Sequence, residues 1–128
     1  MITALHTLVY ADDADAARAF FRDVLQWPHV DTGGGWLIFK SGPSELGVHP
    51  TSGGSDADGS AWSTPEHHEI SLVCDDLEAT MAELRERGAT FTREARDDGF
   101  GLTTELAIPG CRQAILLFEP RYDPPALG

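Results

Sequence analysis

Apolar and polar positions along the chain follow the same order twice. Residues 6–20 read HTLVYADDADAARAF, and residues 69–83 read EISLVCDDLEATMAE. Each stretch has a short apolar run, a pair of aspartates and an alanine-containing helical pattern. The second stretch follows the first by 63 positions, which is close to half of the 128 residues. An internal repeat of this kind predicts two similar modules that bury a common face against each other.

The first half of the chain predicts a strand, a helix and further short strands. The apolar run at 5–11 is typical of a strand, and a helix begins at Asp12 or Asp13 and continues to about Leu25. The apolar stripe of this helix consists of Ala16, Ala17, Phe20, Phe21, Val24 and Leu25. Beyond it we expect strands at 36–40 and 45–49, with room for another around 29–32.

The second half repeats this order. Asp75 and Glu78 make a capping-box-like start for a helix that ends at Gly88. The apolar positions of that helix are Leu77, Met81 and Leu84. A turn is expected at 97–101, and the strands of this half are predicted at 68–74, 89–95, 102–108 and 112–119.

These elements divide the chain into two βαβββ modules, at 1–50 and 67–122. Residues 51–66 are small and polar with several glycines and serines, which predicts a flexible connector. Residues 123–128, DPPALG, are typical of a disordered tail.

The formal net charge of −12 narrows the choice of partners. A surface this acidic repels the phosphates of nucleic acids and anionic lipids, and it attracts cationic small molecules. Without a long apolar run or a signal-peptide pattern, the chain is expected to be cytoplasmic and not bound to a membrane. Cys74 and Cys111 form no CxxC pair, and we expect both to be reduced thiols.

Strand alternation brings chemically active side chains to one place. Side chains of neighbouring strand residues point to opposite faces, and the repeat makes His6 and Glu69 equivalent positions at two strand starts. Both are expected to face the inside of a curved sheet, together with Leu46, Leu116 and Phe118. The sequence therefore predicts a site between the modules.

The double β-α-β-β-β order, the Asp-Asp helix starts and a closing strand that ends in FEP at 118–120 resemble the vicinal oxygen chelate superfamily. This group includes glyoxalase I, extradiol dioxygenases and bleomycin-resistance proteins. The resemblance implies an α+β fold in which paired βαβββ modules form a curved mixed sheet with a central cleft. It also implies that metal ligands would occupy the positions of His6, Leu46, Glu69 and Leu116. The family's closing turn, Asp-Pro-Asp-Gly, is replaced here by Ile108-Pro109-Gly110.

Because leucine cannot coordinate a metal, two of the four implied ligand positions are apolar. This favours a non-catalytic protein, similar to the bleomycin-resistance branch, that sequesters a hydrophobic small molecule of aromatic or cationic character and needs no cofactor. The residues expected to line its site are His6, Tyr10, Trp36, Phe39, Leu46, Trp62, Glu69, Phe100, Leu116 and Phe118.

The alternative is a metal-dependent lyase, isomerase or dioxygenase that holds a divalent ion with His6 and Glu69. Such a site needs a third ligand, from His68, Glu105 or a second chain. The resemblance further implies a homodimer. The sequence leaves open whether the cleft forms within one chain or between two, and whether Trp62 anchors its loop or closes over the cleft.

Overall fold

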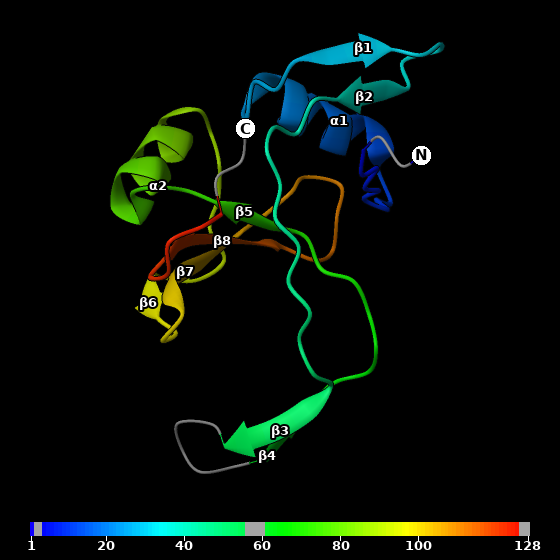
Figure 1. The fold of residues 1–128 in the computed structure, drawn as a ribbon. Coiled ribbons are helices and arrows are strands. Elements are labelled where there is room, and N and C mark those ends of the chain that lie inside the picture. The colour runs from blue at the N-terminus through cyan, green and yellow to red at the C-terminus, as the bar shows by residue number, and fades with distance from the viewer. Residues whose placement is uncertain (2–3, 56–60, 126–128) are drawn as a thin grey trace.

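The protein is an α+β chain whose described residues form two helices and eight short strands in three sheets (Figure 1). The computed structural model describes residues 1, 4–55 and 61–125. The predicted fold class is confirmed. Neither described helix is long and apolar enough to cross a bilayer.

Both predicted helices are present, and each begins directly after an aspartate. In α1 (Ala14–Asp23) the Asp13 carboxylate accepts the N–H of Ala16 at 3.0 Å. In α2 (Leu77–Glu86) the Asp76 carboxylate accepts the N–H of Ala79, also at 3.0 Å. The predicted capping box with Asp75 is therefore wrong by one residue, because Asp76 and not Asp75 accepts a free N–H group of the first turn.

The second module contains a mixed four-stranded sheet in the order β5-β8-β7-β6. Here β5 (Ser71–Val73) lies parallel to β8 (Ile115–Pro120), which pairs antiparallel with β7 (Gly101–Leu106). The outer strand is β6 (Arg96–Asp97), also antiparallel.

The strand predicted at 89–95 is not formed, apart from a single bridge between Phe91 and Leu106. Pairing with β7 falls instead at 96–97, where the sequence predicted the beginning of a turn. The Asp98 N–H donates to the Gly101 carbonyl at 3.0 Å, so the turn is tight enough for β6 to pair up to its edge.

The first module is less regular than the second. Strands β1 (His29–Asp31) and β2 (Leu37–Phe39) form a hairpin, and β3 (Ser52–Ser55) with β4 (Ala61–Ser63) forms another within the expected connector. Figure 1 shows the second hairpin projecting away from the rest of the chain at the end of two extended segments.

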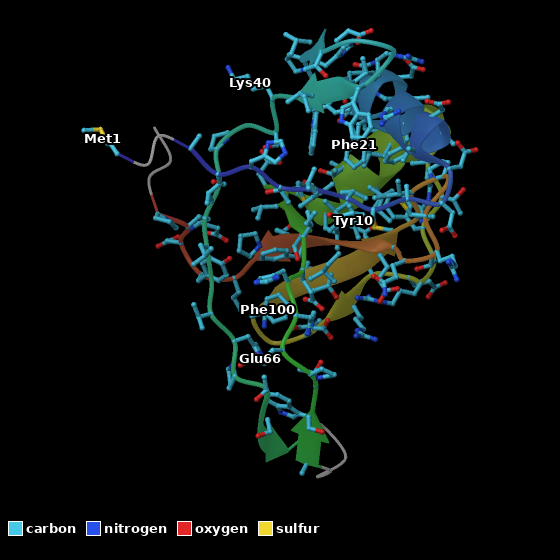
Figure 2. All side chains as sticks on the ribbon, turned by 90° about the vertical axis from the view of Figure 1, so that its right-hand side faces the viewer. Met1, Tyr10, Phe21, Lys40, Glu66 and Phe100 are labelled. Carbon is cyan, nitrogen blue, oxygen red and sulfur yellow. The ribbon has the colours of Figure 1, made fainter. Side chains whose placement is uncertain are left out.

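The strands predicted at 5–11 and 45–49 are not formed. Both segments run as extended chain (Figure 2), but among the described residues neither pairs with a strand through backbone hydrogen bonds. An alternating apolar pattern becomes a strand only where another backbone satisfies its N–H and C=O groups. The apolar residues of these segments consequently stay exposed.

One hydrophobic core joins the two modules. Phe20 of α1 and Met81 of α2 belong to the same buried cluster, which also contains Leu106 and Leu117 from the sheet. Contacts between the modules include the Asp13 N–H donating to the Gly110 carbonyl at 3.1 Å. The predicted burial of a common face is thus present in the helices and the second sheet.

Candidate ligand-binding site

The sheet of the second module has one face covered by α2 and another that carries mixed side chains. Leu106 and Leu117 belong to the covered face and are buried with the helices. On the opposite face two rows run across β5, β8 and β7. The first row is Ser71, Leu116 and Glu105, and the second is Val73, Phe118 and Thr103. We call this the open face.

Three aromatic rings, from Phe100, Phe118 and Tyr122, meet at one end of the open face and are named the aromatic cluster. The Phe118 ring is 8% exposed and lies 5.5 Å from the Phe100 ring, edge to face. Its centroid is 6.5 Å from the Tyr122 ring. Phe100 and Tyr122 are 47% and 44% exposed, so two rings are open to a ligand and the third supports them.

A carboxylate from the first module reaches this cluster. The Tyr122 hydroxyl donates a hydrogen bond to Glu45 Oε1, across 77 positions of sequence. The bond to the carboxylate raises the pKa of Tyr122, because ionising the phenol would remove the donor and place two negative charges together. The aromatic cluster therefore has one anionic group at its edge.

Four other polar side chains on or beside the open face, from Thr92, Arg93, Asp98 and Thr103, interact with each other or with Glu105. Thr103 Oγ1 donates to Asp98 at 2.7 Å and accepts from Arg93 at 2.8 Å. Arg93 also lies 3.5 Å from Glu105, which accepts the hydroxyl of Thr92 at 3.0 Å. This network fixes the charged side chains beside Leu116.

Burial acts to raise the pKa of Asp98, but its surroundings reverse the effect. Hydrogen bonds from Thr103 and Arg96, together with the charges of Arg96 and Arg93, hold the pKa of Asp98 below its ordinary value of 3.8. Asp98 is therefore an anion paired with two cations, and not a proton donor at neutral pH.

Of the ten residues expected to line a site, the structure brings Leu116, Phe118 and Phe100 together on or beside the open face. Figure 2 shows Phe100 lying between Tyr10 above it and Glu66 below it. Tyr10 belongs to the extended segment 4–11 and is highly exposed.

Three other expected aromatic residues have local partners instead. Phe39 packs on Phe21, with ring centroids 5.7 Å apart, and forms part of the core. The Arg18 guanidinium lies over the Trp36 ring, 4.8 Å from its centroid. Trp62 lies 5.1 Å from the His49 ring in the projecting hairpin, where it packs locally.

Among the described residues, no hydrogen bond or ion pair joins His6 to Glu69. His6 is exposed, as is Leu46 on its own extended segment. Glu69 bonds His67, at 3.1 Å from Nε2 to Oε1. The Pro65 carbonyl and Glu69 raise the pKa of His67.

The donors present do not fit the metal that the fold family implies. Two of the four implied positions are leucine, and no group of three His, Cys, Asp or Glu side chains among the described residues could hold an ion. The two cysteines are free thiols, and burial raises the pKa of both.

Sequence reasoning missed Tyr122 and Glu45. Alternation along β8 places residues 116, 118 and 120 on one face, and continuing it two residues beyond the strand could have found Tyr122. Glu45 carries no such signal, because segment 40–50 pairs with no strand in the described chain.

The described residues form an α+β fold in which an aromatic cluster and a carboxylate lie at one end of the open face. The family model of the Glyoxalase/Bleomycin resistance protein/Dioxygenase superfamily matches residues 3–112. The chain belongs to this superfamily, which confirms the resemblance seen in the sequence. It has no matching relative among the curated proteins.

Solved structures of similar fold come from both enzymes and binding proteins. A lactoylglutathione lyase from Agrobacterium tumefaciens is 20% identical with a TM-score of 0.59, and the match covers 91% of this chain and 92% of that one. A superfamily member from Sphaerobacter thermophilus is 19% identical with a TM-score of 0.53, covering 92% and 98%. An antibiotic binding protein from a Streptomyces species is 16% identical with a TM-score of 0.51, covering 94% and 99%. These likenesses establish the fold.

Proposed function

We propose that the protein binds and sequesters a hydrophobic small molecule of aromatic character, in the manner of an antibiotic-resistance protein, without transforming it. The observation that supports this best is the aromatic cluster on the open face. The half-exposed rings of Phe100 and Tyr122 pack on the buried ring of Phe118. Phe118 shares its face with Leu116, and a metal enzyme of this family would have a metal ligand at the position of Leu116. A structurally similar chain is an antibiotic binding protein.

The expected energies indicate what such a ligand needs. Burying ~250 Å² of its apolar surface contributes roughly 6 kcal/mol before the entropy of association is subtracted. Micromolar binding requires about 8 kcal/mol net. Aromatic stacking adds about 0.5–1.5 kcal/mol for each pair of rings. A ligand with flat rings and one polar anchor therefore fits better than an aliphatic one.

The rival function is a metal-dependent lyase, isomerase or dioxygenase of the same superfamily. The side chains at the implied metal-ligand positions disfavour this function. Leu46 and Leu116 occupy two of these positions, and Glu69 is bonded to His67. Elemental analysis of protein purified without chelators distinguishes the two functions. About one transition metal ion held per chain would favour the enzyme.

We also propose that the protein acts as a homodimer. Residues 4–11 and 46–50 contain no formally charged side chain, in a chain of net charge −12. Both segments are extended, and they expose large apolar side chains: Leu5, Leu8, Val9, Tyr10, Leu46 and Val48. Exposed apolar segments with unpaired backbone favour association, and a second copy would supply the missing strand partners.

The binding proposal is tested with flat polycyclic aromatic compounds, antibiotics among them, by fluorescence titration and thermal shift. Phe100→Ala should weaken binding at least tenfold with little loss of stability, since the side chain is half exposed. Trp36→Ala is the matched control, because Trp36 is an exposed aromatic residue outside the cluster. Equal losses in both variants, or no binding by the unaltered protein, would count against the proposal.

A further inference from the structure

Glu45 differs in its partner from Asp97, Asp98 and Glu105, the carboxylates of β6, β7 and the turn between them. Asp97 is bonded to Arg121 at 2.6 Å. Asp98 is bonded to Arg96 at 2.8 Å, and Glu105 lies near Arg93. Each of these anions has a cation beside it, which reduces its attraction for a charged ligand.

The partner of Glu45 is a neutral hydroxyl. Within the described residues its carboxylate forms no ion pair, and it accepts the Tyr122 hydroxyl through Oε1. A carboxylate has two oxygens and about four acceptor positions, so one hydrogen bond leaves most of its capacity unused. It therefore keeps its full negative charge and a free oxygen at the edge of the aromatic cluster.

The distances suit a ligand that is both flat and positively charged. Tyr122 belongs to the aromatic cluster, and its hydroxyl donates a hydrogen bond to Glu45. The carboxylate therefore lies directly beside one of the rings. A ring stacked on Phe100 and Tyr122 would bring a cationic substituent to Glu45, and the same rings attract a cation through their π faces.

We propose that Glu45 and Tyr122 form a cation subsite at the edge of the aromatic cluster, and that the ligand is an aromatic cation. The inference rests on the proposed binding function and names the chemical class of the ligand. Tyr122 orients the carboxylate and stacks on the ligand, while Glu45 neutralises the ligand's charge. The net charge of −12 adds a general attraction for cations, which is not specific to this place.

The test compares two compounds of the same shape, N-methylacridinium, which is a permanent cation, and acridine, which is neutral at neutral pH. Fluorescence titration of the whole protein should show roughly fivefold tighter binding of the cation. Glu45→Gln should remove most of this preference, leaving the part that comes from net charge and from the aromatic rings, and should leave the affinity for acridine unchanged. Tyr122→Phe should keep the preference, because the carboxylate keeps its charge.

Glu86→Gln is the matched control, because Glu86 is an exposed carboxylate at the end of α2, which covers the opposite face of the sheet. It removes one negative charge and lowers the general attraction by the same small amount, so it should change the preference far less than Glu45→Gln does. If Glu86→Gln lowers the preference as much as Glu45→Gln does, the preference comes from net charge and the inference is overturned. Equal affinity of the unaltered protein for both compounds overturns the cation subsite and leaves the binding function standing. Binding of neither compound overturns both.

Discussion

Asp13 and Asp76 hold the first turns of the two helices in the same way. Each carboxylate accepts the backbone N–H three residues further on, at 3.0 Å, and the two aspartates are 63 positions apart. The repeat in the sequence therefore extends to the hydrogen bonds that begin each helix. A side-chain oxygen at this position satisfies one of the free N–H groups of the first turn.

Removing either capping aspartate should lower the stability of the protein by a similar amount. We expect Asp13→Ala and Asp76→Ala each to lower the free energy of unfolding by about 1 kcal/mol, measured by urea denaturation. Asp75→Ala is the control, since the capping residue is Asp76, and should change stability by less than about 0.5 kcal/mol. A larger loss in Asp75→Ala than in Asp76→Ala would mean that the helix begins one residue earlier.

The helices could be predicted because local signals determine them. The aspartate caps, the apolar stripe with Phe20 and Phe21, and the glycine after α2 all act within one or two turns. Strands at 5–11 and 45–49 could not be predicted in the same way. Their apolar alternation is present, but a strand also requires a partner backbone, which a single chain does not offer them among its described residues.

Strand alternation predicted the candidate site where that site lies on paired strands. Alternation along β8 correctly placed Leu116 and Phe118 on one face. The aromatic side chains of Phe39 and Trp36 gave the same signal in sequence, but one joins the core and the other stacks under Arg18. Hydrophobicity alone does not distinguish an aromatic residue that packs inside from one that meets a ligand.

Gly110 should tolerate alanine much less well than Gly88. Both have positive φ, at 86° and 94°, which costs an alanine about 1 kcal/mol or more. A Cβ at Gly110 would also collide with the backbone carbonyl of Asp13, whereas a Cβ at Gly88 meets nothing within 4 Å. Denaturant titration should show a clearly larger loss of unfolding free energy for Gly110→Ala than for Gly88→Ala. Equal losses would mean that the modules separate easily where Gly110 meets Asp13.

Thr103 should support Asp98 in a way that depends on pH. The Thr103 side chain is fully buried and bonded to both Asp98 and Arg93, so Thr103→Val should cost about 1–3 kcal/mol at neutral pH. Because folding lowers the pKa of Asp98, its contribution is present above 3.8 and is lost as the pH falls through the lowered value. The difference in the free energy of unfolding between the unaltered protein and Thr103→Val should therefore become smaller at acidic pH.

Denaturant titrations over a pH series measure this difference. Thr92→Val serves as the comparison, because Thr92 is exposed and should contribute less than about 0.5 kcal/mol at every pH. If the loss of unfolding free energy in Thr103→Val stays constant down to the lowest pH, Asp98 has no role in it.

The exposed apolar segments should determine the oligomeric state. Light scattering on a size-exclusion column should give twice the chain mass of 13.9 kDa. Val48→Asp places a charge on the unpaired segment and should shift the protein toward the monomer. Val30→Asp makes the same change on β1, which already has a strand partner, and should leave the dimer intact. A monomer in the unaltered protein would refute the homodimer.

Tyr122 should ionise above its ordinary pKa of 10 as long as Glu45 is present. The hydrogen bond to the carboxylate favours the neutral phenol, so its stabilising effect exists below the unfolded pKa and disappears as the pH rises through the folded one. The tyrosinate absorbance, followed in a Tyr10→Phe background, isolates the Tyr122 titration, because the chain has two tyrosines. Glu45→Ala should move the midpoint down toward the ordinary value, while Glu69→Ala should leave it where it is. A midpoint that does not respond to Glu45→Ala would show that segment 40–50 does not rest against the aromatic cluster in solution.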